Sequence, residues 1–430
     1  MKNNFLRKCI ATVLVASSLT ICLCSCEKQL PDRVDKANDL MATVQKSESA
    51  PEYDFKAETN SPEIYDNYIN KNATLALGLL KAEDYAMKNT AVAPVAVTLN
   101  LSAIENGASG DTLKQIKKYL GKTTYTTEDI NQCAAYLTQR MSFFNTESVG
   151  VFNVNSMWVA EAASPKRGFL QKYDNYYNIF AYRTDFADAK TPLLISNLIK
   201  DNSMNLIPAD AIAVKNDYKV YLDSSVALSD NWLYGYGEDN ISTADFTTND
   251  GKKVQATYLT SVERAFTVEN ATGFIKDMKN TPCKLLCVVP DEDTTLEKYV
   301  ADLKTENLVD LARSASPTSF ATVSMPEFSV SSSTSVKDTL IALGIEDLFT
   351  ADAKLDKAFV NGTYVNDFTQ NVAIKVGRNG VSTELAIENP TPNSQKASES
   401  IKVNRPFLYA VIDNESNAPI IIGTVNNPSV

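Results

Sequence analysis

The stretch IKVNRPFLYAVIDNESNAPIIIGTVNNP, residues 401–428, contains two apolar runs, PFLYAVID and APIIIGTV, that predict two buried strands. Another strand-like run, NVAIKV, ends at Val376. Between them lie the polar residues 380–400, GVSTELAIENPTPNSQKASES. A hairpin needs only about two to five connecting residues, and structureless loops longer than about 12–15 residues are usually functional or disordered. The segment therefore predicts a loop with a function of its own.

The first part of this loop has the pattern of a strand. Apolar and polar residues alternate over residues 381–388, with Val381, Thr383, Leu385 and Ile387 on one face and Ser382, Glu384, Ala386 and Glu388 on the other. Such alternation is typical of a strand with one side on a core and the other toward water. Gly380, directly before it, gives the backbone the freedom to fold back. We therefore expect this part of the loop to be able to join a sheet.

Composition limits what the rest of the chain can do. The 430 residues are 44% hydrophobic and 22% charged, include no histidine, and carry a formal net charge of -11. Catalysis by Ser-His-Asp or Cys-His groups and histidine-ligated zinc are excluded, whereas carboxylate-only glycosidases and Ser-Lys enzymes are not. Cys283 and Cys287 fit buried strand positions rather than a metal site. We expect no metal, no cofactor and, without a basic face, no nucleic-acid partner.

The N-terminus predicts export. A basic start, an apolar run too short to be a permanent membrane span, and small residues are typical of a signal peptide at residues 1–25. Leu23-Cys24-Ser25-Cys26 resembles the bacterial lipobox, which implies a lipid on Cys26; the alternative is an ordinary secretory leader with incidental cysteines. Glu27 follows where Asp commonly retains lipoproteins in the inner membrane, so we expect an outer-membrane or cell-surface protein, with the periplasmic face as the alternative. Residues 26–61 are polar and nearly aperiodic, as in a flexible tether.

Helical and strand-like patterns are mixed over residues 62–430. Helices are predicted around residues 62–88, 110–121, 168–180, 294–304 and 333–344. Strands are predicted at residues 217–228, 252–259, 284–290, 318–330 and 363–376 and in the two C-terminal runs. No internal repeat or composition break interrupts this part. A single α+β domain over residues 62–430 is the expected fold.

Three blocks in this domain resemble the serpin family in the usual order. They are AVAPVAVTLNLSAIENGASGDTLKQIKKYLG at residues 91–121, SMPEFSVSSSTSVKDTLIALGIEDLF at residues 324–349, and the C-terminal stretch at residues 401–428. Asn404-Arg405-Pro406-Phe407, followed by Leu408 and Tyr409, fits the C-terminal signature of the family position by position. The resemblance implies three β-sheets, eight or nine helices, and an exposed reactive loop at about residues 380–400.

The resemblance also implies a function for the loop. In inhibitory serpins a serine protease cleaves the loop and forms a covalent acyl-enzyme, and the cut loop then enters the main sheet as a new strand. The hinge would comprise Gly380, Val381, Ser382, Thr383, Glu384 and Leu385. Three features depart from the family pattern: Arg378 replaces a glutamate, bulky residues replace small ones in the hinge, and Pro390 and Pro392 would each remove a donor from an inserted strand.

The family also suggests where the sheet opens and where the loop is cut. The matching sheet-opening positions are Ala93, Pro94, Ala96, Ser224, Gln370 and Trp232. Because the asparagine and histidine positions of the family change together, a rewired polar contact between Ser224 and Gln370 is expected, with ordinary packing drift as the alternative. Counting from Gly380 places the cut at Ser394–Gln395, whereas counting back from Pro406 places it at Gln395–Lys396. A trypsin-like target would prefer Lys396, although a lysine in a polar loop is also simply solvated.

Two functions follow. The first is an irreversible suicide inhibitor of serine endopeptidases, with papain-like cysteine enzymes as further targets, acting as a monomer held at a membrane by its lipid. The alternative is a non-inhibitory serpin, a binding or structural module whose loop is only a protease substrate. An enzyme is not expected.

Overall fold

The computed structural model describes residues 34–45, 62–142, 144–208, 212–314, 319–383, 387 and 390–430. Contacts group these residues into one compact unit. The predicted signal peptide and Cys26 lie outside the described residues, as do Glu384 and Leu385 of the hinge. No helix in the described part is both long enough and apolar enough to cross a membrane.

Nine α-helices occur within the described residues. They are α1 Pro62–Ala82, α2 Pro94–Glu105, α3 Gly110–Leu120, α4 Thr127–Ser142, α5 Arg167–Lys172, α6 Thr191–Asn202, α7 Leu296–Asp302, α8 Thr305–Ser314 and α9 Lys337–Ala342. Proline occupies the first turn of α1 and α2, where its missing N–H has no helical acceptor to lose. Every residue of α2 is buried, and α2 contacts strands of both sheets.

The strands of the described residues form two hydrogen-bonded sheets. They are β1 Thr90–Val92, β2 Gly150–Ala160, β3 Phe180–Thr184, β4 Val220–Asn231, β5 Ile241–Thr247, β6 Lys253–Val268, β7 Ala271–Asp277, β8 Cys283–Pro290, β9 Phe320–Pro326, β10 Phe328–Ser335, β11 Asp367–Gly377, β12 Gly380–Val381, β13 Glu399–Lys402, β14 Phe407–Asp413 and β15 Pro419–Val425. The α+β class and the serpin-like set of helices and sheets are as predicted.

The larger sheet accounts for two of the three predicted sheets. Its strand order is β1-β15-β14-β8-β7-β6-β9-β13, with β5 paired to β6. The long strand β6 pairs with β5 and β9 over residues 253–264 and with β7 over residues 264–268. Because β6 is shared, two groups of strands that the resemblance counts separately are hydrogen-bonded into one sheet. The predicted C-terminal strands are β14 and β15 in its interior.

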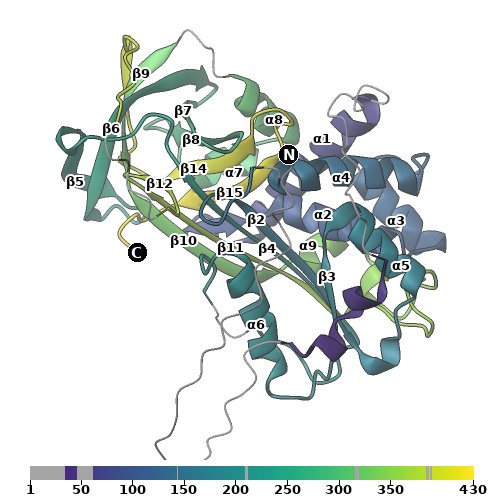
Figure 1. Ribbon diagram of the computed structural model, residues 1–430. Coiled ribbons are helices and arrows are strands. Elements are labelled where there is room, and N and C mark those ends of the chain that lie inside the picture. Colours follow the sequence, from purple (N-terminus) through teal and green to yellow (C-terminus); the bar gives the residue numbers. More distant parts are fainter. Residues whose placement is uncertain are drawn as a thin grey trace, which may run out of the picture. The chain divides into compact units, whose positions relative to one another are not determined.

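The smaller sheet contains the first residues of the predicted reactive loop. Its strand order is β10-β11-β12-β4-β2-β3, and its long strands run side by side across Figure 1. Strands β4 and β11 run parallel and pair directly from Tyr221–Asp367 to Ala227–Ala373. We call this line of pairing the seam. Beyond the Ala227–Ala373 end of the seam, the short strand β12 lies between the two strands and pairs antiparallel with each.

The two faces of the seam are different. On one face Val226, Leu228, Val372 and Ile374 belong to the main hydrophobic core, on the side of α2. On the other face Tyr221, Ala227 and Ala373 join a second apolar cluster with Ile195 and Ile199 of α6. Side chains alternate between these two faces along each strand.

Part of the expected tether packs on the domain. Residues 36–43 form two short 3-10 turns, and Leu40, Met41 and Val44 are buried. Asp39 forms a bridge with Tyr182 of β3, and the Gln171 side chain donates to the Gln45 carbonyl at 2.8 Å. Apolar side chains in an otherwise polar segment explain this packing. Residues 34–45 are therefore part of the folded unit rather than a free linker.

Candidate functional site

The loop begins inside the smaller sheet. Val381 pairs with Val376 of β11 and with Asp230 of β4, and Gly380 pairs with Gly377 and Asn231. Val381 is fully buried in the main core. The first two residues of the predicted hinge are therefore already a strand between β4 and β11.

The backbone around residue 380 leaves no room for any residue other than glycine. The φ of Gly380 is +156°, and a Cβ there would lie 1.9 Å from the carbonyl oxygen of Asp230. Ser382, with φ of 45°, turns the chain out of the sheet, and its N–H donates to the Lys375 carbonyl at 2.6 Å. Thr383 is the next described residue and is half-buried.

Trp232 and Arg378 make contacts at the end of the smaller sheet where the loop begins. The buried indole of Trp232 donates to the Gly377 carbonyl at 2.8 Å, directly before the hinge. The guanidinium of Arg378 lies 3.2 Å from Glu238, and its backbone N–H donates to Glu327 at 3.0 Å. Arg378, which replaces the family glutamate, thus forms an exposed ion pair of its own.

The predicted sheet-opening residues meet at the seam. Ser224 and Gln370 are directly paired on β4 and β11 and face α2, which begins at Pro94. The Ala93 N–H donates to Gln370 Oε1 at 2.9 Å, and the Ser224 hydroxyl donates to the Ala96 carbonyl at 3.1 Å. The expected bond between the Ser224 and Gln370 side chains is not formed, because each side chain bonds the backbone of α2 instead.

A carboxylate that the sequence analysis did not single out lies on the opposite face of the seam. Asp223 is fully buried, and its oxygens accept hydrogen bonds from Ser225 at 2.6 Å, Thr369 at 2.9 Å and Asn371 at 2.6 Å. Burial raises the pKa of Asp223 to about 7. The one signal in the sequence is an aspartate in the middle of the strand-like run YKVYLDSSVAL.

The candidate cleavage residues are accessible. Ser394, Gln395 and Lys396 are exposed, and residues 390–397 belong to no strand. Asn393 links this part of the loop to β6, because its amide donates to the Val262 carbonyl at 3.0 Å. Within the loop, its Oδ1 accepts from the Gln395 N–H at 3.1 Å. Beyond it, β13 pairs parallel with β9 at the edge of the larger sheet.

The loop also touches the segment after β4. Ile387 is half-buried against the main core. A Cβ on Gly235 would lie 2.8 Å from Ile387 and 2.9 Å from Pro390. The side chain of Ile387 therefore rests on the backbone of Gly235. No group of three or more His, Cys, Asp or Glu side chains that could hold a metal ion occurs in the described part of the chain.

The loop and its two anchors define the class of protein. In this α+β fold an exposed loop starts as a strand within one sheet and ends on the edge of the other. The sequence model of the family described as Serpin (serine protease inhibitor) matches residues 70–428. The chain therefore belongs to the serpin family.

Known proteins agree with this assignment. Serpin A3-2 of Bos taurus is 25% identical over 358 residues, which cover 80% of this chain and 84% of the bovine protein. The crystal structure of the thermophilic serpin tengpin in its native state has a TM-score of 0.79 at 26% identity, and the match covers 90% of this chain and 99% of tengpin. Tengpin in its latent state has a TM-score of 0.70 over 84% of this chain and 98% of tengpin.

Proposed function

We propose that this chain is an irreversible suicide inhibitor of serine endopeptidases. A target protease cleaves the exposed loop near Ser394–Lys396 and remains attached as an acyl-enzyme while the cut loop enters the seam. The observation that carries this proposal is the pairing of β12 with both β4 and β11, since it sets the register in which the loop would continue.

That register places each following residue between a defined pair. Continuing antiparallel from Val381, Thr383 falls between Leu228 and Ile374, Leu385 between Val226 and Val372, and Ile387 between Ser224 and Gln370. Val226, Leu228, Val372 and Ile374 belong to the main core. The apolar face of the alternating segment would thus meet the core, and its polar face would meet the side covered by α6.

The same register accounts for the two prolines. Pro390 would pair with Tyr221 and Asp367, the first directly paired residues of the seam, and Pro392 would lie beyond them. A proline is tolerated at the end of a strand, where its missing donor costs little. The ten residues from Gly380 to Asn389 can therefore fill the seam without a proline inside it.

Insertion is expected to be strongly favourable. Full burial of an exposed leucine or isoleucine side chain stabilises a protein by about 1.5–3 kcal/mol. Ile387 is already half-buried before insertion, so its gain is smaller than that of a fully exposed residue. Each new ladder hydrogen bond adds about 0.5–1.5 kcal/mol. Such gains, summed over one central strand, are comparable to the stability of a whole domain, about 5–15 kcal/mol. The inserted strand could therefore distort an enzyme attached to its end.

Electrophoresis in SDS after mixing with trypsin, with elastase and with a papain-like protease tests the proposal. A band at the combined mass of the protein and the protease is expected, together with a fragment whose new N-terminus lies within residues 394–397. Quantitative cleavage at that position with full recovery of protease activity would instead support the non-inhibitory alternative.

We also propose that the chain is an exported, monomeric lipoprotein attached through Cys26 at the outer membrane or cell surface. The export signal and the lipobox-like residues in the sequence support this location. A lipid anchor would place the reactive loop outside the cytoplasm, where foreign proteases act.

A further inference from the structure

The buried carboxylate of Asp223 bridges the two strands that insertion must separate. Its Oδ2 accepts hydrogen bonds from Thr369 and Asn371 of β11, across the seam, and its Oδ1 accepts from Ser225 of its own strand. Asn371 also donates to Ser225 at 3.1 Å. These side chains close the face of the seam that lies under α6.

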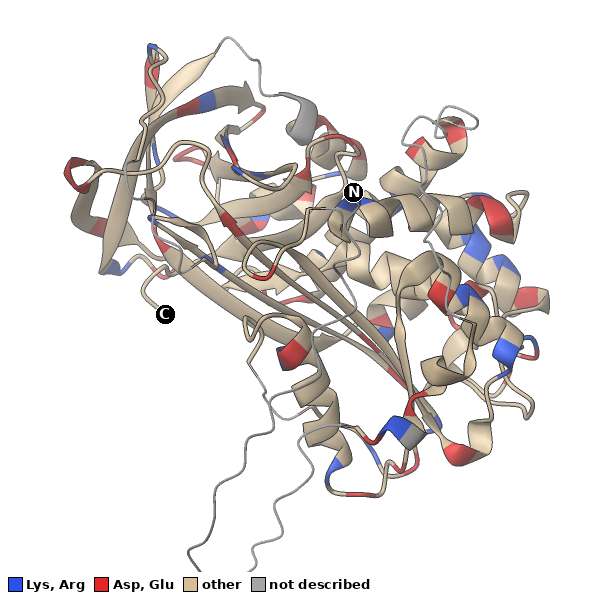
Figure 2. Ribbon diagram, viewed as in Figure 1, with Lys and Arg blue, Asp and Glu red and all other residues tan. Residues whose placement is uncertain are grey.

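The surroundings of Asp223 supply no positive charge. From β2, Ser156 pairs with Asp223, and the Trp158 indole bonds Ser156. From α6, Ile195 and Ile199 cover the apolar cluster on this face. Among the described residues, no lysine or arginine contacts the carboxylate, and the long strands of this sheet are largely uncharged in Figure 2.

Two further titratable groups on this face, Tyr221 and Asp367, are acidic. The basic Lys375 lies on the same face of β11, but it is four residues beyond Asn371 and exposed. The phenol of Tyr221 bonds Thr369, and burial and the charge of Asp223 raise its pKa. Asp367, at the start of β11, accepts hydrogen bonds from Tyr218 and Ser335. Neither group can compensate a negative charge on Asp223.

The partners of Asp223 fit both of its protonation states. A hydroxyl can donate to a carboxylate or accept from a carboxylic acid, so Ser225 and Thr369 can serve either form. The ionised form, however, loses far more hydration free energy than the neutral acid when the seam is closed over it. Opening of the seam returns water to the carboxylate and therefore favours the ionised form.

We propose that Asp223 is a proton-linked clasp of the seam between β4 and β11, which closes with the uptake of one proton by Asp223 and opens with its release. The raised pKa of Asp223 agrees with this coupling and places it near neutral pH. The role of the clasp in inhibition rests on the insertion proposed above, whereas the coupling itself is a property of the intact protein.

Hydrogen exchange of the intact protein between pH 5 and pH 8.5 tests the clasp, after correction for intrinsic amide rates. Because the closed form binds the proton more tightly, opening at residues 222–227 and 368–373 should become more frequent as the pH rises. One proton gives at most about tenfold per pH unit, and the rise should level off above about pH 7.5. In Asp223→Asn the frequency of opening should not change with pH and should stay as low as in the wild type at pH 5.

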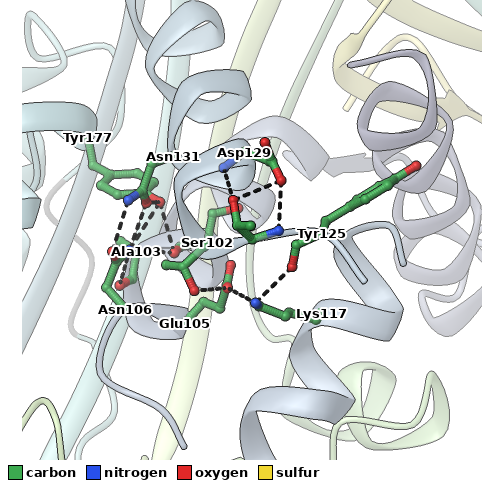
Figure 3. Close-up of polar contacts among 11 residues, drawn as sticks. Ser102, Ala103, Glu105, Asn106, Lys117, Tyr125, Asp129, Asn131 and Tyr177 are labelled. Carbon is green, nitrogen blue, oxygen red and sulfur yellow. Dashed lines mark hydrogen bonds and ion pairs between the residues drawn. The ribbon is translucent and has the colours of Figure 1, made fainter. Parts of the chain in front are cut away.

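The matched control is a second buried carboxylate outside the seam. Glu105, at the end of α2, is 1% exposed, and burial raises its pKa to about 7. It accepts a hydrogen bond from Thr127 at 3.0 Å and lies 3.9 Å from Lys117. Figure 3 shows Glu105 and Lys117 side by side. Glu105→Gln should leave the pH profile unchanged for the seam amides that exchange through local opening of the seam rather than through global unfolding.

A further variant keeps the experiment decisive if Asp223→Asn does not fold. Thr369→Val removes one hydrogen-bond donor to the ionised carboxylate of Asp223. The midpoint of the exchange profile of this variant should therefore lie at higher pH than that of the wild type. A flat wild-type profile, or an unchanged rise in Asp223→Asn, would overturn the clasp. Failure of insertion appears separately, as the absence of a covalent complex, and leaves these exchange measurements unaffected.

Discussion

The α-carbon of Gly380 lies against the carbonyl of Asp230, so closely that a Cβ would be 1.9 Å from that oxygen. Asp230 cannot move away easily, because its carboxylate accepts hydrogen bonds from the backbone N–H groups of Asn280 and Thr281. The contact fixes where the loop enters the sheet. In the proposed inserted form, every residue that follows Gly380 would take its place in the seam from this one pairing.

Replacing Gly380 should therefore uncouple the loop from the sheet. In Gly380→Val, the side chain clashes with β4 and the hinge strand cannot form, which should destabilise the native state by about 1–3 kcal/mol. It should also lower the fraction of covalent complex with trypsin or elastase, measured on gels. Gly362→Ala is the control, since nothing lies within 4 Å of a Cβ there. Equal complex yields for the two variants would contradict the assigned entry point.

A charge on the core-facing side of the hinge should block insertion. Thr383→Arg would place a guanidinium between Leu228 and Ile374, and an unpaired buried charge is strongly disfavoured. We expect normal cleavage of the loop, no covalent complex, and no rise in Tm after cleavage, whereas the cleaved wild type should gain more than about 10 °C. Thr391→Arg, beyond the seam, should behave as the wild type. Complex formation by Thr383→Arg would refute the register.

Membrane attachment should depend on one cysteine. Cys26→Ser removes the proposed lipidation site and should abolish incorporation of a labelled fatty acid and recovery in the detergent phase, because an acyl chain adds about 0.8 kcal/mol per buried CH₂. Cys24→Ser should retain both. A labelled Cys26→Ser protein would exclude the anchor and leave the inhibitor proposal untouched.

The C-terminal strands and several helices were predictable because their patterns are local. Residues 62–82 and 110–120 show helical spacing, and both form helices, α1 and α3. Helix α2 was not predicted as a helix, because every one of its residues is buried and no polar face reveals the period. Strand β2 was missed as well, since Asn153 and Asn155 interrupt its apolar residues.

The part of the site that depends on long-range pairing could not be read from the sequence. Asp223 and Asn371 are 148 positions apart, and only the parallel pairing of β4 with β11 brings them together. Ser224 and Gln370 were identified through the family resemblance, but their bonds to α2 follow from the orientation of a helix that the pattern did not show. Local periodicity specifies elements, whereas the partners of a buried polar group depend on topology.

The buried carboxylate of Glu105 should make stability depend on pH. Its pKa is raised by burial to about 7, above its ordinary value of about 4.3, so the native state binds the proton more tightly than the unfolded state. Its contribution is most favourable at low pH and is lost as the pH rises toward 7. Glu105→Gln should therefore raise stability at pH 8 by about 1–3 kcal/mol and have little effect at pH 4.5. Urea unfolding at both values measures this, and equal effects at both would show that ionisation is not the cause.

The insertion register makes a last prediction about the cleaved form. It places Glu388 between Asp223 and Thr369, so full insertion would bring two carboxyl groups together on a buried face. Two such groups cannot both ionise without a large cost, and the pair should retain a proton at neutral pH. Glu388→Gln should therefore raise the Tm of the cleaved protein at pH 8 by several degrees and have little effect at pH 5. Glu399→Gln, an exposed change on β13, should alter neither value. An unchanged Tm for cleaved Glu388→Gln at pH 8 would mean that the inserted strand ends before Glu388 reaches Asp223, and that the prolines terminate insertion earlier than the register allows.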